Sequence, residues 1–306
     1  MGVFFSERYH VFGLLVESEL ALPELIIGNF TPDVKVRFGK VNESIEKPLL
    51  SGICYKTDFQ KFLLKVDGIA QYLVENGNLI TIDRSEGGSD EEIRLFLLGS
   101  AFGALIHQRG ILPLHGSAIV VDNHALIFSG VSGAGKSTLA AGFVKRGYKL
   151  LADDVCVITL NEKGLPIAHP GYPQMKLWSD SLENLGHTVI SLRRNRRTGK
   201  KISLPIQADF HNAPLPVKGI YVISSIEGGN IEVEALCGEL KFNAINDNMY
   251  RLNFLKGSRN DLPHLKHIAS ISENCFVKRL MRPSKGFHIS KIIELVENDI
   301  DIVYVK

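Results

Sequence analysis

The segment Gly130-Val-Ser-Gly-Ala-Gly-Lys136-Ser137-Thr138 constrains this chain more than any other stretch of its sequence. It matches the P-loop pattern G-x-x-x-x-G-K-[ST] at every position. Its glycines allow backbone conformations that turn several N–H groups toward one point, where phosphate oxygens bind. The apolar run at 125–129 predicts a buried strand before the loop, and 136–146 predicts a helix after it. Strand, loop and helix in this order predict a nucleotide-phosphate site.

We expect the whole loop to take part in binding the nucleotide. Its backbone amides and those of the first helical turn would surround the phosphates. Lys136 would reach the β- and γ-phosphates, and the Ser137 hydroxyl would bind Mg²⁺. The predicted nucleotide contacts are Gly130, Val131, Ser132, Gly133, Ala134, Gly135, Lys136, Ser137 and Thr138.

Composition limits the other classes of function. The chain has 306 residues, 45% of them hydrophobic and 22% charged, which is normal for a globular protein of one or two domains. A formal net charge of +2 gives no reason to expect nucleic acid or a membrane surface as a general partner. The four cysteines are widely spaced, and no signal peptide or membrane-length apolar stretch is recognisable. We therefore expect a cytoplasmic protein without a nucleic-acid or membrane partner.

The chain is predicted to have two domains. Residues 1–90 contain short alternating runs such as 34–38, which predict a small β-rich N-terminal domain. Asp67-Gly68 and the turn at 76–78 are expected to join neighbouring strands. Residues 91–306 would form an α/β domain that holds the P-loop. In that domain, the strands expected at 218–224 and 231–236 are predicted to pair as a hairpin.

Two adjacent carboxylates, Asp153 and Asp154, interrupt the apolar stretch at 148–159. Burying an unpaired carboxylate costs several kcal/mol, so two in a core need a cation or a proton. Acidic residues on a strand beside a P-loop normally hold Mg²⁺ or orient the nucleophile. We expect this pair to serve the phosphate site; an acidic turn is the alternative.

His115 and a group of basic residues are further candidates. A hairpin formed by 112–121 and 125–129 would place His115 near the P-loop, although a lone histidine at a strand end is often structural. Six of the nine residues at 193–201 are basic, which is typical of a solvated loop but also of a phosphate clamp. The candidate phosphate or substrate contacts are Arg193, Arg194, Arg196, Arg197, Lys200, Arg251 and Arg282.

These motifs together resemble one kinase family. His115-Gly116, the hairpin, Ser129-Gly-Val-Ser-Gly-Ala-Gly-Lys-Ser137, Lys145-Arg-Gly-Tyr148 and Leu151-Ala-Asp-Asp154 resemble the C-terminal domain of HPr kinase/phosphorylase in order and spacing. The resemblance covers about residues 112–160. The family's downstream signature has no counterpart here, and Lys176-Leu-Trp178 takes its place.

The resemblance implies a P-loop kinase core of the HPr kinase and phosphoenolpyruvate carboxykinase type, with ATP and Mg²⁺ as cofactors. It implies that Asp153 is the base that accepts the proton of a serine hydroxyl. It also implies that Asp154 and Ser137 share Mg²⁺, and that His115 supports the acidic pair or the γ-phosphate. Related enzymes are often oligomers, so a homo-oligomer is an expectation for this chain.

The whole chain is similar to the branch of this family found with peptide-modifying pathways. Leu22-Pro-Glu-Leu25, Phe96-Leu-Leu-Gly99, His107-Gln-Arg-Gly110 and Leu114-His-Gly116 carry this similarity. In that branch, kinases phosphorylate the C-terminal serine of a lasso-peptide precursor, so the expected partner is a peptide with an acceptor serine. Two alternatives stay open: a kinase of a small hydroxyl metabolite such as free serine, and a regulator that binds ATP without transfer.

Overall fold

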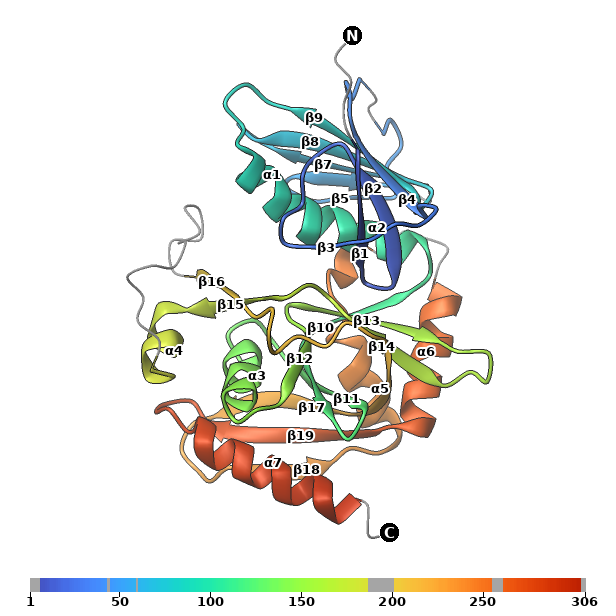
Figure 1. Ribbon diagram of the computed structural model, residues 1–306. Coiled ribbons are helices and arrows are strands. Elements are labelled where there is room, and N and C mark those ends of the chain that lie inside the picture. The colour runs from blue at the N-terminus through green and yellow to red at the C-terminus, as the bar shows by residue number, and fades with distance from the viewer. Residues whose placement is uncertain (1–5, 43–44, 59, 187–200, 255–260, 304–306) are drawn as a thin grey trace. The chain divides into compact units, whose positions relative to one another are not determined.

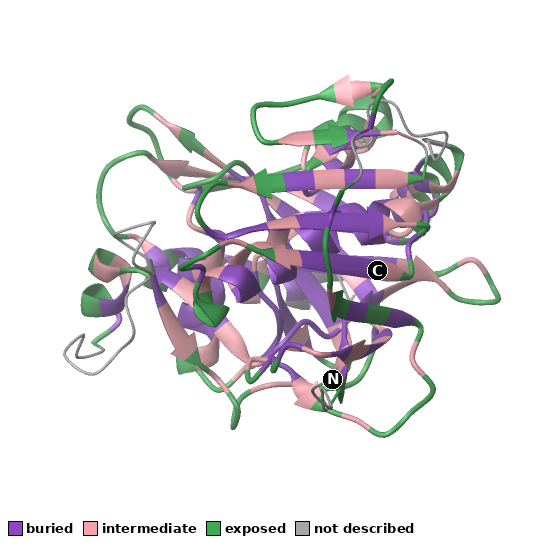
Figure 2. Ribbon diagram, turned by 90° about the horizontal axis from the view of Figure 1, so that it is seen from above, coloured by how far each residue is buried: buried purple, intermediate pink, exposed green. Residues whose placement is uncertain are grey.

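The computed structural model describes residues 6–42, 45–58, 60–186, 201–254 and 261–303. The chain has a mixed α/β fold with several sheets and divides into two compact units (Figure 1). The first unit comprises Met1–Pro113, Val157–Thr159 and Met249–Ala269, and the second comprises Leu114–Cys156, Leu160–Asn248 and Ser270–Lys306. Buried residues are concentrated on strands and helices, whereas many of the connecting loops are exposed (Figure 2).

The first unit is built on a nine-stranded sheet with the order β3-β1-β2-β4-β9-β8-β7-β6-β5. Its strands are β1 (Glu7–Val11), β2 (Leu14–Ser18), β3 (Ile26–Ile27), β4 (Val34–Phe38), β5 (Leu50–Ser51), β6 (Tyr55–Thr57), β7 (Lys61–Val66), β8 (Ala70–Glu75) and β9 (Leu79–Arg84). In β4, Val34 and Val36 are buried while Lys35 and Arg37 lie on the other side, which is the alternation that the sequence predicts.

Two predicted turns of this sheet are confirmed. Strands β7, β8 and β9 pair antiparallel in sequence order. The β7–β8 turn contains Gly68 at φ 71°, and the β8–β9 turn contains Asn76 and Gly77 at φ 51° and 66°. Successive residues at positive φ give the turn the twist that a two-stranded hairpin needs, and Asn-Gly is the pair that best tolerates it.

A continuous helical segment follows the sheet. It consists of α1 (Asp90–Phe96), the π-helical turn η1 (Leu97–Ala101) and α2 (Phe102–Gln108). The Ser89 hydroxyl accepts the Glu92 N–H and the Glu92 carboxylate accepts the Ser89 N–H, so a capping box starts α1. The buried Tyr72 hydroxyl of β8 donates to the Ile93 carbonyl. Because the segment packs on the sheet in this way, it groups with the first unit, which differs from the predicted boundary near residue 90.

The first unit contains a buried histidine pair, His107 and His264. His107 Nε2 lies 2.7 Å from the Tyr250 carbonyl, and its Nδ1 lies 3.3 Å from His264 Nε2. Nε2 of His264 is also 3.1 Å from the Ile111 carbonyl. Both rings therefore fit as neutral Nε2–H tautomers, with His107 Nδ1 as an acceptor. Burial, and then His264, lower the pKa of His107 from 6.5 to about 3.

We expect the free energy of unfolding to fall as the pH drops from about 6.5 toward 3, by about 1.4 kcal/mol per pH unit while only the unfolded chain takes up this proton. Above pH 6.5 the ring is neutral in both states and contributes no slope. Urea unfolding at pH 7.5 and pH 5 measures the loss. His107→Gln keeps a donor for Tyr250 but cannot titrate, so it should flatten the profile, whereas the surface change His124→Asn should not. An unchanged slope in His107→Gln would assign the acid sensitivity to other groups.

The second unit is built on an eight-stranded mixed sheet. Its path is β11-β10-β13-β14-β17-β19-β18, with β12 paired to β10 and β11 also paired to β17. The strands are β10 (Leu112–Val121), β11 (His124–Ser129), β12 (Lys149–Ala152), β13 (Val155–Leu160), β14 (Pro166–His169), β17 (Leu215–Ile226), β18 (Glu232–Ala235) and β19 (Phe276–Pro283). A separate ladder joins β15 (Gln174–Trp178) to β16 (Lys201–Pro205).

The described helices beyond α2 belong mostly to this second unit. They are α3 (Lys136–Lys145), α4 (Ser179–Asn184), α5 (Gly238–Asn246), α7 (Ile289–Val303), α6 (Asp261–Asn274), which starts in the first unit and ends in the second, and the 3₁₀ turn η3 (Leu252–Phe254) of the first unit. Among the described residues, no helix has both the length and the apolar character needed to cross a membrane.

The predicted hairpin of 218–224 and 231–236 is wrong. Both strands exist as β17 and β18, but β19 lies between them. β17 pairs parallel with β19, and β18 pairs antiparallel with the same strand. A short connection made the hairpin the simplest expectation, and β19, some forty residues later in the chain, takes the central place instead.

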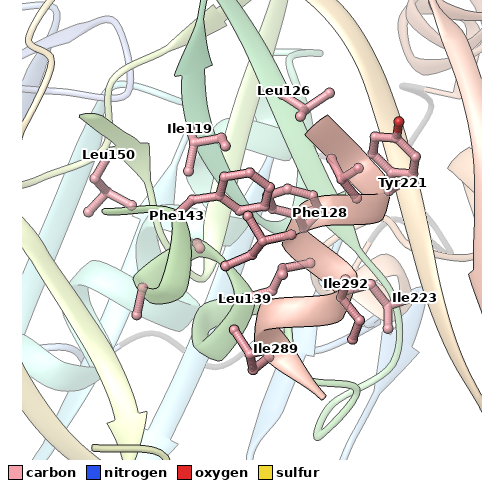
Figure 3. Close-up of a cluster of buried hydrophobic side chains, with 14 of the residues drawn as sticks. Ile119, Leu126, Phe128, Leu139, Phe143, Leu150, Tyr221, Ile223, Ile289 and Ile292 are labelled. Carbon is pink, nitrogen blue, oxygen red and sulfur yellow. The ribbon is translucent and has the colours of Figure 1, made fainter. Parts of the chain in front are cut away.

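The core of the second unit surrounds α3 and fixes the start of this helix (Figure 3). Phe128 of β11 stacks on Phe143 of α3 with ring centroids 5.3 Å apart. Gly142 lets α7 approach closely, since a Cβ there would lie 2.6 Å from Ile289 Cγ2. Each large apolar side chain buried here contributes about 1.5–3 kcal/mol. Strand β11 and helix α3 therefore hold the two ends of the P-loop rigidly.

Candidate active site

The hairpin of β10 and β11 brings His115 to the P-loop, as the sequence predicts. In its antiparallel register Gly116 pairs with Ser129, the last residue before the loop. The Ser129 hydroxyl donates to the His115 carbonyl at 2.9 Å. The His115 backbone N–H also donates to the Asn248 carbonyl at 2.8 Å. The backbone of His115 is thus fixed on two sides at the start of the phosphate loop.

The loop itself has the backbone that its glycines allow. Gly130, Gly133 and Gly135 have φ values of 137°, 85° and 103°, where L side chains are strained. Gly135 is the N-cap of α3, and no side chain caps this helix end. The first backbone N–H groups of a helix have no partner within the helix, and the helix dipole favours an anion there. This uncapped end therefore fits a phosphate group.

The Lys136 side chain packs against the concave side of the P-loop. Its side chain is buried, and its Nζ donates to the carbonyls of Gly130 and Val131 at 2.9 Å each. An ammonium held by the loop carbonyls lies at the concave face of the loop, where it could turn to phosphate oxygens. The Thr138 hydroxyl is 3.0 Å from that of Ser181 on α4, which ties the first turn of α3 to its neighbour.

The acidic pair occupies a sharp turn between β12 and β13. We expected it within a strand, but β12 ends at Ala152 and β13 begins at Val155. Asp154 has φ 69°, and the Val155 N–H donates to the Asp153 carbonyl at 2.9 Å. Aspartate tolerates this left-handed conformation better than most residues. The turn separates the two carboxylates, so that Asp153 is buried and Asp154 is partly exposed.

Asp153 is held in one orientation by hydrogen bonds. The Ser117 hydroxyl donates to Oδ1 at 2.6 Å, and the Lys176 backbone N–H donates to Oδ2 at 2.9 Å. The P-loop residue Ser137 also hydrogen bonds to this carboxylate. Burial raises the pKa of Asp153 and Asp154 adds to the increase, while these three donors oppose it. A buried carboxylate with a raised pKa, bonded to the P-loop, is suited to accept a proton.

His115 contacts the second acid of the pair. Its Nδ1 lies 3.0 Å from the Asp154 carbonyl and 3.5 Å from Asp154 Oδ1. With its proton on Nδ1, the ring supports the strained backbone of Asp154. His115 and Asp154 both line the pocket in front of the P-loop.

That pocket gathers most of the predicted site. Besides His115 and Asp154, residues Ser132 to Leu139 line it. Gly130 and Val131 do not line it, but their carbonyls hold Lys136. Asp153 is buried and is not one of the lining residues. The other lining residues are Lys176, Trp178, Ser181, Ile223, Leu280, Arg282, Gly286, Phe287, His288, Ile289 and Ile292.

The predicted arginines separate into three groups. Arg282 lines the pocket, and its Nε donates to the Ala134 carbonyl at 3.0 Å. Arg251 belongs to the first unit, lies over the rings of Tyr250 and Phe254, and does not line the pocket. Arg193, Arg194, Arg196, Arg197 and Lys200 lie outside the described residues.

Sequence reasoning did not assign Ser117, Lys176, Trp178 or Phe287 to the site. Ser117 follows His115 by two residues on β10, so strand alternation alone would put both side chains on one face. Lys176 and Trp178 share a face of β15 for the same reason. No local signal places β15 or Phe287 beside the P-loop, because these contacts depend on the tertiary fold.

The donor set fits Mg²⁺ only together with a nucleotide. Among the described residues, no group of three or more His, Cys, Asp or Glu side chains is placed to hold a metal ion. The Asp154 carboxylate and the Ser137 hydroxyl line the pocket instead. Mg²⁺ commonly takes one or two protein oxygens and completes its shell with substrate phosphates and water.

Comparisons with known proteins add little to this geometry. No protein-family model matches the sequence, and no curated protein matches it. A solved structure, the Hpr(Ser) kinase/phosphatase from Coxiella burnetii, is similar over 63% of this chain and 99% of that chain. The sequence identity is 12% and the TM-score is 0.35. A similarity of this size does not assign the chain to a family.

Proposed function

We propose that the chain is an ATP-dependent, Mg²⁺-requiring kinase that transfers the γ-phosphate to a serine hydroxyl of a peptide. The finer form of the proposal is that the acceptor is the C-terminal serine of a lasso-peptide precursor, as the motif resemblance implies. The observation that carries the kinase proposal is the contact of a buried, oriented carboxylate, Asp153, with the P-loop residue Ser137. Mere retention of a nucleotide does not need such a carboxylate.

Each residue of the site has a role in this proposal. The amides of the loop and Lys136 bind the β- and γ-phosphates and spread the charge that develops in the transition state. Ser137 and Asp154 hold Mg²⁺, which would neutralise phosphate charge. Asp153 accepts the proton of the acceptor hydroxyl, and His115 fixes the turn that carries both acids. Arg282, beside the loop, gives a further positive charge for the phosphates.

A transfer assay tests the proposal. The protein is incubated with γ-labelled ATP, Mg²⁺ and one acceptor, and the intact mass of the acceptor is measured. The acceptors are a peptide ending in serine, the same peptide with a C-terminal amide, free serine and the carrier protein HPr, with Lys136→Ala as the blank. Label on the peptide supports the proposal. Label on free serine alone would make the protein a metabolite kinase, and tight ATP binding without any label would favour a regulator.

The apolar end of the pocket is where we place the adenine ring. Phe287 is 44% exposed and lines the pocket, as do the apolar residues Ile223, Leu280, Ile289 and Ile292. Adenine is normally held by apolar and aromatic surface of this kind.

Phe287→Ala should therefore weaken ATP binding roughly 10-fold, since stacking of a base on an aromatic ring is worth about 1–3 kcal/mol. Binding of tripolyphosphate, which has no base, should not change. Calorimetric titration of both ligands measures this, and Leu240→Ala, at an exposed position away from the pocket, is the control. Equal loss for both ligands would place Phe287 in the phosphate site or in the fold.

A further inference from the structure

Strand β15 forms a wall of the site that no motif accounts for. Met175 and Leu177 point into the core of the second unit and are almost fully buried. Lys176 and Trp178 lie on the opposite face and line the pocket. Two residues on the same face of a strand are about 7 Å apart. The wall therefore presents an ammonium group and an indole ring to the pocket, close to each other but not in the same place.

Lys176 is joined to the acidic pair, and so to the site of proton transfer. Its backbone N–H holds Asp153 Oδ2, and its side chain hydrogen bonds to the hydroxyl of Tyr172. Burial raises the pKa of Tyr172, Lys176 opposes this, and both Asp154 and Asp153 act on the same hydroxyl. Tyr172, Lys176 and the two acids thus form one cluster. Through Tyr172, the Lys176 ammonium is connected to the acidic pair, which the proposed acceptor hydroxyl must approach.

The other cations of the described pocket belong to its phosphate side. Lys136 is bonded to the loop carbonyls, and Arg282 is bonded to Ala134 within the loop. A bound triphosphate would use these two charges. Lys176 comes from β15 instead, and its side chain bonds to the Tyr172 hydroxyl, on which both acids also act. Its charge is thus placed to meet the second substrate, the acceptor. An acceptor with only a neutral alcohol group would not require a cation there.

We propose that Lys176 and Trp178 form the acceptor subsite, and that this subsite takes a hydroxyl compound whose carboxylate is attached to the carbon adjacent to the hydroxyl-bearing carbon. Lys176 pairs with the carboxylate, and Trp178, which is 40% exposed, packs against the apolar part of the acceptor. A serine at a free C-terminus has this arrangement, and an internal serine does not. The inference rests on the proposed kinase function and specifies which acceptors it takes.

The test changes the charge of the peptide C-terminus and the charge of residue 176, and it compares the resulting binding affinities. Two matched peptides ending in serine, one a free acid and one an amide, are titrated into the full-length protein with Mg²⁺ and a non-hydrolysable ATP analogue. We expect the wild type to bind the free acid roughly 10- to 100-fold more tightly, as a charge-assisted hydrogen bond implies. Lys176→Gln should remove this preference while binding the amide as before, and Lys176→Arg should restore part of it. Lys163→Gln, on an exposed turn, is the control.

The outcomes distinguish failure of the proposed acceptor subsite from failure of the proposed kinase function. Equal binding of both peptides by the wild type, weakening of both peptides alike by Lys176→Gln, or no binding of either peptide would overturn the subsite. A parallel transfer assay tests the chemistry. Transfer to acid and amide alike would support the kinase and overturn the subsite. The expected preference and its loss in Lys176→Gln without any transfer would support a carboxylate subsite and overturn the kinase.

Discussion

Asp153→Asn should reduce phosphate transfer to a small residual rate while leaving nucleotide binding intact. An amide cannot accept the proton of the acceptor hydroxyl, and loss of a general base costs roughly 10²–10⁴-fold in rate. The fold should tolerate the change, because Asn can accept the Lys176 N–H with its carbonyl while its NH₂ group donates to the Ser117 hydroxyl. The measurement is single-turnover transfer together with calorimetric titration of ATP and Mg²⁺.

The neighbouring carboxylate provides the matched control. Asp154→Asn should weaken the apparent affinity for Mg²⁺, so that more metal is needed for half-maximal rate, because Asp154 lines the pocket with Ser137. If Asp154→Asn lost all transfer at saturating Mg²⁺ and Asp153→Asn kept most of it, the two roles would be reversed. This comparison is informative because Asp154 is more exposed than Asp153, and a base must be able to reach the substrate hydroxyl.

Burial also predicts how the rate depends on pH. The pKa of Asp153 is raised above its ordinary value, first by burial and further by Asp154. The base works when deprotonated, so the wild-type rate should fall as the pH drops through this raised pKa. The residual rate of Asp153→Asn should lack this acid limb, and the same transfer assay run as a pH series shows the difference.

The local parts of the site could be predicted because neighbouring residues determine them. The P-loop pattern, the apolar run before it and the helical spacing after it correspond to β11, the loop and α3. The β10–β11 hairpin follows from two apolar runs separated by Asp122 and Asn123, both at positive φ. Each of these features depends on residues that are close in sequence.

The remaining parts depend on contacts between distant segments, which periodicity does not specify. β19 enters the sheet between β17 and β18, and nothing in the apolar runs of β17 and β18 indicates that a third strand will separate them. Asp153 finds its partners in Ser117, far before it, and in the backbone of Lys176, far after it. Strand alternation defines which face Lys176 and Trp178 share, but only the tertiary fold determines what that face meets.

Gly130→Ala should disrupt the phosphate loop much more than Gly133→Ala, although both glycines lie in the same motif at positive φ. A Cβ at Gly130 would be 2.5 Å from the Ile223 carbonyl oxygen of β17, which is backbone and cannot move cheaply. A Cβ at Gly133 would meet no atom within 4 Å. We expect Gly133→Ala to cost about 1–3 kcal/mol from backbone strain alone. Gly130→Ala adds the clash, and it should lower the free energy of unfolding further and remove ATP binding. Urea unfolding and calorimetric titration of ATP for both variants measure this difference. Equal effects would mean that the positive φ, and not the contact with β17, determines the need for glycine at position 130.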